Sequence, residues 1–549
     1  MTVKIAEACT GSGKTSWPAA TPFISDTNGR VPNPRELGLP HDTWRKYQYE
    51  TLLWLTSGKA GRVVSLVKTK SLQASNYDEM YGFDAHYGRA NYRCNHPGAE
   101  AGATCAECMF LETGSMQNCP VSSGCPYLLS KHAAMNSRRA SLNYAYWMTA
   151  RNWRANFPPD VLYCDEAHNL SEIVLDWVGV TVTERQRREW DLPAFPRADS
   201  SRGSGILTKT EPPTDTAVSW LSKAGSTMDG HCHRLESTDR EKFNEASRLN
   251  RKLSNALSAL RQYPDDWFIL SGNAARTYRG KPEPGFICRP LTARYHAANY
   301  FIGAFDTVMM SATIGNPDVF AEELGLTNYE ARAVPSQWPP ESRPIYILDT
   351  PKMGYVKEET KIQREARFGK QADAIAEFVK QWPSDWSGLV HVTRKTEEVA
   401  LANRLASRGL SDRVWVIPGK VENYVPTDRQ LRQWERRKHK IPNSILVTCS
   451  FSEGYDGLDE KINISAKVPF PRVGSRGSYE FAWMTYNRKR YDWRTAVALA
   501  QQQGRNRRGR ECDYDIPGEA RGANAIADAS WERIYPMLPG DIQEAIVKV

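Results

Sequence analysis

A loop of small residues follows directly after a short apolar segment near the start of the chain. Residues 8–15 read Ala-Cys-Thr-Gly-Ser-Gly-Lys-Thr. Glycines and small side chains let consecutive backbone N–H groups turn toward a polyphosphate, while the lysine reaches the outer phosphates and the threonine hydroxyl ligates Mg²⁺. The pattern therefore predicts a site for a nucleoside triphosphate. Its expected members are Ala8, Thr10, Gly11, Ser12, Gly13, Lys14 and Thr15.

Two adjacent carboxylates end a second apolar segment. Asp165 and Glu166 begin the sequence Asp-Glu-Ala-His and follow the apolar residues 161–164. One carboxylate at a strand end can hold a metal ion while its neighbour activates water. A short acidic turn is a weak signal by itself, because most such turns are only solvated. The loop and the acidic pair together, each after an expected strand, favour hydrolysis of the triphosphate.

Three further polar motifs occur later in the chain. Ser-Ala-Thr stands at 311–313, Glu-Gly-Tyr-Asp at 453–456, and Gln-Gln-Gln-Gly-Arg-Asn-Arg-Arg at 501–508. Arg505 and Arg508 are three residues apart and would share one face of a helix, from which two guanidinium groups can meet a γ-phosphate. The plain alternatives are a turn at each strand end and a solvated basic patch.

Five of the eleven cysteines lie close together, at Cys94, Cys105, Cys108, Cys119 and Cys125. In a reducing compartment such clustering favours a metal over disulfides. Four thiolates can hold either a [4Fe–4S] cluster or Zn²⁺. Zinc ribbons usually combine two Cys-x-x-Cys pairs, and this segment has one.

Length and composition limit the other possibilities. The 549 residues, 40% hydrophobic and 25% charged, suit a globular protein with two to four domains. No apolar run is long enough to span a membrane, and the N-terminus does not resemble a signal peptide, so we expect a cytoplasmic location and no membrane partner. The net charge of +9 is compatible with a polyanionic partner without requiring one.

Short β-branched segments alternate with helical patterns, which indicates an α/β fold. Helical periodicity is present over 249–260 and 371–382, and a proline-rich stretch at 334–344 predicts a linker between two domains. The expected strands lie at 3–8, 62–67, 161–164, 306–310, 343–348, 388–392 and 444–448.

The five motifs and their order resemble those of superfamily 2 helicases with a DEAH box. The chain resembles the XPD/DinG branch of iron–sulfur DNA helicases in residues 88–94, in Cys-Pro-Tyr at 125–127 and in Asn-Tyr-Ala-Tyr at 143–146. The cysteines also lie between the phosphate loop and the acidic pair, as in that branch. The resemblance extends from residue 1 to about residue 530 and is weakest over 170–300.

The resemblance implies two RecA-like motor domains, each built on a parallel sheet. The first is expected at 1–335 and the second at 336–549. Within the first, residues 85–135 correspond to an iron–sulfur insertion and 170–300 to a mainly helical, arch-like insertion. ATP would bind between the two domains, and single-stranded DNA would run across both.

Site residues follow from the resemblance by position. Lys14 and Thr15 would bind phosphate and Mg²⁺, Asp165 would hold the metal, and Glu166 would activate water. The second domain would sense the γ-phosphate through Gln501, Arg505 and Arg508, with Glu453 and Asp456 near the nucleotide. The segment with Thr69, Leu72 and Gln73 resembles one that touches the DNA backbone. Gln48 belongs to an Arg-x-x-Gln element that normally precedes the phosphate loop but here follows it, which makes its contact with adenine doubtful.

The same resemblance implies a [4Fe–4S] cluster, with Zn²⁺ as the alternative. Its ligands would be Cys94, Cys105, Cys108 and Cys125, while Cys119 could replace Cys105 or Cys108.

The resemblance thus leads to a functional hypothesis. We expect an ATP-dependent DNA helicase that moves 5′ to 3′ on single-stranded and forked DNA and acts as a monomer. The alternatives are a DNA-stimulated translocase that does not unwind duplexes, a zinc-stabilised nucleic-acid-binding protein with weak ATPase activity, and a motor that acts on RNA.

Overall fold

A computed structural model describes most of the chain. The described residues are 3–8, 14–27, 33–37, 39, 46–70, 73–99, 102–108, 119–150, 157–196, 214–235, 238–279, 281–334, 339–418, 426–451, 460–474, 478–504 and 522–548.

A parallel seven-stranded sheet forms the first domain. Its strand order is β10-β1-β9-β5-β2-β4-β3, and all neighbouring strands run parallel. Because β9 lies between β1 and β5, the carboxyl ends of these three strands meet at one edge of the sheet. The strands are β1 (Val3–Ala8), β2 (Val63–Val67), β3 (Asp84–His86), β4 (Arg139–Asn143), β5 (Val161–Asp165), β9 (Asp306–Ser311) and β10 (Tyr329–Val334).

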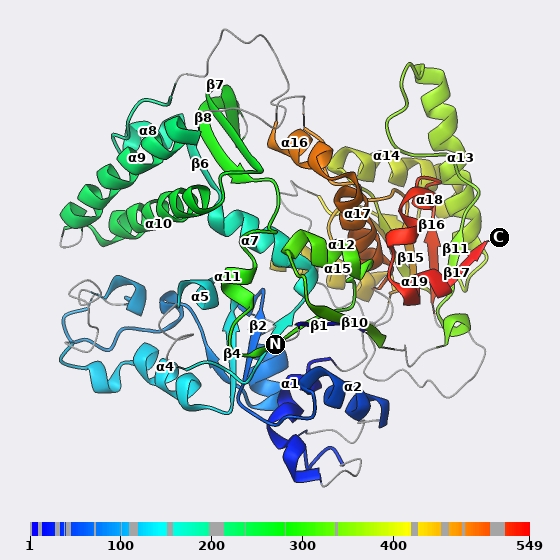
Figure 1. The fold of residues 1–549 in the computed structure, drawn as a ribbon. Helices are drawn as coiled ribbons and strands as arrows, with labels where there is room; N and C mark the ends of the chain where they lie inside the picture. Colours follow the sequence, from blue (N-terminus) through cyan, green and yellow to red (C-terminus); the bar gives the residue numbers. More distant parts are fainter. Residues whose placement is uncertain are drawn as a thin grey trace.

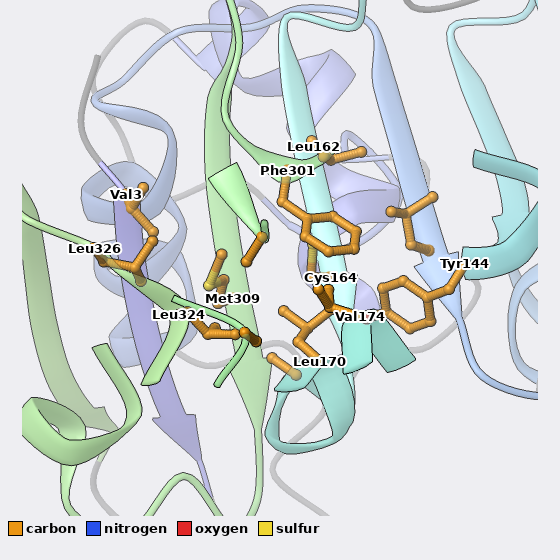
Figure 2. Close-up of a cluster of buried hydrophobic side chains, with 14 of the residues drawn as sticks. Val3, Tyr144, Leu162, Cys164, Leu170, Val174, Phe301, Met309, Leu324 and Leu326 are labelled. Atoms are coloured by element: carbon orange, nitrogen blue, oxygen red, sulfur yellow. The ribbon is translucent and has the colours of Figure 1, made fainter. Parts of the chain in front are cut away.

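Both faces of this sheet are buried, as parallel strands require. On β5, Leu162 and Cys164 enter one apolar cluster, while Val161 and Tyr163 enter the other. Figure 2 shows the first cluster, in which Phe301 and Met309 lie among the strand side chains. The covering helices are α1 (Ser16–Ala20), α2 (Lys46–Thr56), α4 (Pro126–Asn136), α5 (Tyr144–Thr149), α7 (Leu170–Val178), α11 (Ala298–Phe301) and α12 (Pro317–Leu324).

A second parallel seven-stranded sheet forms the other domain, in the order β13-β14-β12-β15-β16-β11-β17. The two RecA-like sheets expected from the sequence are therefore confirmed. The strands are β11 (Ile345–Ile347), β12 (Ser387–His391), β13 (Val414–Trp415), β14 (Ile445–Thr448), β15 (Glu460–Ser465), β16 (Ala523–Ile526) and β17 (Ile546–Lys548). The helices are α13 (Lys361–Lys380), α14 (Lys395–Leu405), α15 (Asp428–Lys440), α16 (Tyr479–Tyr486), α17 (Arg488–Gln503), α18 (Trp531–Ile534) and α19 (Gly540–Glu544).

The expected boundary between residues 335 and 336 falls outside the described residues and stays a prediction. Within the described part of the chain, no helix is both long enough and apolar enough to cross a membrane.

The chain between β5 and β9 forms a separate layer of structure, seen at the upper left of Figure 1. Two long helices, α9 (Thr214–Leu235) and α10 (Arg240–Gln262), pack together through apolar residues such as Leu221 and Leu253. The sequence predicts these helices but not the antiparallel sheet β6-β8-β7 beside them. The remaining elements are β6 (Val180–Thr183), α8 (Glu184–Glu189), β7 (Trp267–Arg279) and β8 (Lys281–Pro290).

The cysteine-rich insertion expected at 85–135 starts at β3, includes most of α4 and has little core of its own. Its buried apolar cluster holds only Cys105, Cys125 and Tyr127 among the described residues. Tyr127 and His86 of β3 lie with their ring centroids 4.9 Å apart, which fastens the segment to the first sheet. The segment therefore relies on this sheet, or on a bound group, for its stability.

Helix α17 belongs to the second domain but packs against both domains (Figure 1). Trp493 and Val497 are four residues apart and enter the core of the first sheet. Leu499 and Ala500 enter the core of the second domain. At its N-terminal end, Arg490 pairs with Glu323 of α12 at 2.8 Å, and both side chains are almost fully buried. One helix thus joins the two sheets.

We predict that Arg490→Met lowers the free energy of unfolding by about 3–5 kcal/mol, because the Glu323 carboxylate stays buried without its cation. Urea denaturation measures this change. Arg188→Met is the matched control, since Arg188 pairs with Glu184 at 2.8 Å but is 75% exposed. Its loss should cost less than about 1 kcal/mol, and equal losses for the two variants would contradict the prediction.

Candidate active site

The phosphate loop leaves the first sheet at the end of β1. Ala8 is the last residue of that strand, and Lys14 and Thr15 stand just before α1. The Lys14 ammonium donates a hydrogen bond to the Ala8 carbonyl at 2.8 Å, so its side chain folds back over the start of the loop. Residues Thr10, Gly11, Ser12 and Gly13 lie outside the described residues.

Asp165 ends β5 two strands away and is 7% exposed. One carboxylate oxygen, Oδ2, accepts from the Tyr77 hydroxyl at 2.9 Å, and Oδ1 accepts from the Glu166 N–H at 2.9 Å. Burial and the adjacent Glu166 carboxylate raise the pKa of Asp165, while the nearby Lys14 ammonium opposes this rise. The Lys14 ammonium therefore acts electrostatically on the Asp165 carboxylate, and the shared catalytic role of the loop lysine and the acidic pair stays a prediction.

The backbone of Glu166 is strained. Its φ of 51° and ψ of 44° are left-handed, a conformation that costs a residue with a side chain about 1–3 kcal/mol. The side chain is held by β9, since its Oε2 accepts from the Ser311 hydroxyl at 3.2 Å. Nδ1 of His168 lies 3.2 Å from the same oxygen. Such strain is typical of functional sites, and here it directs Glu166 toward the motif at 311–313.

The motif at 311–313 connects the acidic pair to the second domain. The Ser311 hydroxyl lies 2.7 Å from Nδ1 of His168. The Thr313 hydroxyl accepts from the Gln501 side-chain amide of α17 at 2.7 Å, and both residues are buried. A chain of hydrogen bonds thus runs from Glu166 through Ser311 and Thr313 to the second domain, where Gln501 was expected to act.

Arg494 forms a second contact across the interface. Its guanidinium donates to the His168 carbonyl at 2.8 Å and forms an ion pair with Glu172, whose pKa it lowers. Arg494 is not among the site residues expected from the sequence. A signal was present, because Arg490, Arg494, Val497 and Gln501 recur at helical spacing on one side of α17.

Several predicted site residues lie outside the described part of the chain. These are Glu453, Asp456, Arg505 and Arg508. Gln48 is described, is buried in the first turn of α2, and its contact with adenine stays a prediction.

The structure corrects one expectation for the nucleic-acid segment. Gln73 is fully buried, and its amide donates to the carbonyls of Ser141 at 2.7 Å and His86 at 3.1 Å. Its side chain therefore supports the sheet and does not face a nucleic acid. Thr69 is exposed, whereas Leu72 lies outside the described residues.

Two of the four predicted metal ligands, Cys105 and Cys125, lie close together. The thiols of Cys105 and Cys125 lie 3.9 Å apart. Two thiolates on one tetrahedral zinc ion would lie about 3.8 Å apart, because each Zn–S bond is about 2.3 Å long. Among the described residues, however, no group of three His, Cys, Asp or Glu side chains is placed to hold a metal ion. The arrangement as described does not complete a four-ligand site.

Glu7 of β1 holds the C-terminal part of the second domain against the first. Its carboxylate accepts from the N–H groups of Gly315 at 2.5 Å and Gly540 at 3.3 Å. Gly315 has a φ of 69°, and an added Cβ would meet the Met537 carbonyl at 2.5 Å, so a side chain would separate the domains here. Burial raises the pKa of Glu7 to about 8, with Asp541 contributing.

The shifted pKa of Glu7 predicts a pH dependence of stability. Between its ordinary pKa of 4.5 and about 8, the folded protein holds a proton that the unfolded chain releases. The free energy of unfolding therefore falls as the pH rises from 5 to 8. We predict that Glu7→Gln flattens this dependence in thermal unfolding, whereas Glu189→Gln at an exposed position leaves the slope unchanged. A slope equal to that of the wild type in Glu7→Gln would contradict the assignment.

Comparisons with known proteins agree with the architecture. No protein-family model and no curated protein sequence matches this chain. A solved structure of XPD in its apo form has a TM-score of 0.50 at 12% identity, covering 100% of this chain and 97% of that chain. S. tokodaii Xpd4 has a TM-score of 0.48 at 11% identity, covering 100% and 96%. Identity this low shows the fold alone, and the chain has the two-domain fold of the XPD helicases.

Proposed function

We propose that this protein is an ATP-driven motor that moves along nucleic acid. One observation carries the proposal: the acidic pair Asp165–Glu166 of the first domain is linked by hydrogen bonds through Ser311 and Thr313 to Gln501 of the second. The Lys14 ammonium acts on the same acidic pair electrostatically. A hydrolysis site connected to two domains can convert the state of a nucleotide into a movement between them.

The chemistry assigned to the site is hydrolysis of a γ-phosphate. Lys14 binds the β- and γ-phosphates, and Glu166 accepts a proton from the attacking water. Bound Mg²⁺ would neutralise phosphate charge, and the buried Asp165 carboxylate and the Thr15 hydroxyl are oxygen donors of the kind that suits it. Gln501, Arg505 and Arg508 act on the γ-phosphate from the second domain.

The hydrogen-bond chain gives hydrolysis a route to the second domain. Loss of the γ-phosphate changes the charge next to Glu166, whose carboxylate shares Ser311 with His168. Thr313 is hydrogen-bonded both to this group and to Gln501, so a rearrangement at the acidic pair shifts the contact with α17. Each turnover would thereby alter how the two domains bind the nucleic acid along which the motor moves, called its track below.

A basic cavity on the second domain supports a polyanionic track. It has a volume of about 1390 Å³ and follows the carboxyl ends of β12, β14 and β15. Its cationic side chains attract phosphates, and the exposed Tyr355 ring offers a surface on which a base can stack. The cationic residues are Lys352, Arg394, Lys395, Lys467, Arg472 and Arg533.

We further propose that the track is DNA, that movement is 5′ to 3′, and that the motor unwinds forked duplexes as a monomer. These details rest on the resemblance to the XPD/DinG branch. The cysteine segment favours DNA over RNA, because that branch carries such a segment at the same place in the chain.

We predict that Lys14→Ala lowers the DNA-stimulated ATPase rate at least about 100-fold, because the γ-phosphate loses its main cation. The measurement is steady-state ATP hydrolysis with and without single-stranded DNA. Lys59→Ala is the control, since Lys59 is 72% exposed and lies outside the site. A Lys14→Ala protein as active as the wild type would refute the motor. Stimulation by RNA alone would redirect the proposal to an RNA motor.

The cysteine segment is proposed as a [4Fe–4S] site, with Zn²⁺ as the alternative, and no step of the mechanism depends on it. Four of its cysteines are buried although the segment has little core, which supports a bound group that holds it together.

Metal analysis of the purified protein decides between the [4Fe–4S] cluster and the zinc ion. We predict about four iron atoms per chain for the cluster, and one zinc ion for the alternative. Cys105→Ser should lose the metal, whereas Cys288→Ser, buried in the layer between β5 and β9, should retain it. Wild-type protein without either metal would overturn the proposal for this segment.

A further inference from the structure

Tyr77 is a buried tyrosine that the proposed hydrolysis mechanism does not use. It lies in the π-helical segment Gln73–Glu79 and has no exposed surface. Its hydroxyl reaches the end of β5 and donates to Oδ2 of Asp165 at 2.9 Å. The side chain therefore contacts the carboxylate that is assigned to Mg²⁺, from a segment that carries none of the assigned catalytic residues.

The ring of Tyr77 is fixed by its surroundings. It meets the ring of Phe83 edge to face, with centroids 5.1 Å apart. The main chain closes the same turn, because the Phe83 N–H donates to the Tyr77 carbonyl at 3.1 Å. At the other end of the segment, the Gln73 amide donates to the carbonyls of His86 and Ser141. The hydroxyl is consequently held in one place relative to β5.

The Asp165 carboxylate needs such a restraint. The terminal torsion of an aspartate is broad, so an unrestrained carboxylate rotates between many orientations. Here Tyr77 holds one oxygen and the Glu166 N–H holds the other, each at 2.9 Å. Tyr144 fixes the backbone of the same residue by donating to the Asp165 carbonyl at 2.6 Å. Only Tyr77 among these donors is a side chain bound to the carboxylate.

We propose that Tyr77 is a positioning residue for the metal ion of the nucleotide site. Its hydroxyl fixes the plane of the Asp165 carboxylate, so that the carboxylate meets Mg²⁺ without first losing rotational freedom. This inference rests on the proposed function, since it takes Asp165 as the residue that holds Mg²⁺. Partners that orient metal ligands typically change metal affinity or activity about 10- to 100-fold when they are removed.

The test compares ADP binding with and without Mg²⁺ by isothermal titration calorimetry. In the wild type, Mg²⁺ should tighten ADP binding. In Tyr77→Phe, which retains the ring and its contact with Phe83, the tightening should fall by about 10-fold or more. Binding of ADP in the presence of EDTA should not change, because the phosphate loop is intact. The ATPase reaction should require more Mg²⁺ for half-maximal rate.

Tyr163→Phe is the matched control. Tyr163 is also fully buried and stands on β5 itself, but its hydroxyl hydrogen-bonds Thr21 at 2.8 Å and not Asp165. This variant should bind ADP as the wild type does, both with and without Mg²⁺. Equal thermal midpoints of the two variants would exclude a general loss of structure.

The possible results separate the inference from the proposed function. An unchanged Mg²⁺ effect in Tyr77→Phe would overturn the positioning role, as would an equal weakening of ADP binding with and without Mg²⁺. A wild type that binds ADP with no contribution from Mg²⁺ would instead overturn the proposed function, and the inference with it.

Discussion

The candidate site depends on the contact of α17 with both domains. The Trp493 side chain lies in the core of the first sheet, and the Leu499 side chain lies in the core of the second domain. A helix with two apolar sides cannot leave either core without exposing large side chains to water. The Trp493 indole also donates to the Ile314 carbonyl at 2.6 Å, close to the motif at 311–313. This packing places Gln501 next to Thr313.

The interface has two parts with different physical roles. The apolar part and the buried Arg490–Glu323 pair define where the domains meet, and breaking that pair would leave a charge buried. The polar part, from Glu166 to Gln501, consists of neutral and charged hydrogen bonds at the edge of the sheet. Hydrogen bonds of this kind rearrange at lower cost than a packed core. A motor built this way can use the first part as a pivot and the second as its sensor.

Much of the architecture could be predicted from the sequence. β1, β5 and β9 are apolar, β-branched runs, and the polar motifs after them revealed where each strand ends. The order of strands in the sheet could not be read, because pairing between distant segments leaves no local pattern. Seven further strands of the two sheets were not expected, because each is short or polar: β3, β4, β10, β13, β15, β16 and β17. The hairpin of β7 and β8 was missed because the helical pattern of α10 dominated its surroundings.

The candidate site was predicted less evenly. Lys14, Asp165 and Gln501 belong to motifs with fixed spacing, so their types and order carried a signal. Tyr77, Glu7 and Arg494 act through contacts with residues far away in the chain, and a single tyrosine, glutamate or arginine has no signature of its own. Gln73 was assigned to the nucleic acid by its place in a motif, and only the fold reveals that its amide is used inside the protein.

The most direct test of the central claim is an experimental structure with Mg²⁺ and a non-hydrolysable ATP analogue. The account predicts one triphosphate between the two domains. Its γ-phosphate should lie within about 3 Å of Lys14 and of Gln501, Arg505 or Arg508. A triphosphate held by the first domain alone, with the C-terminal end of α17 facing away from it, would contradict the account.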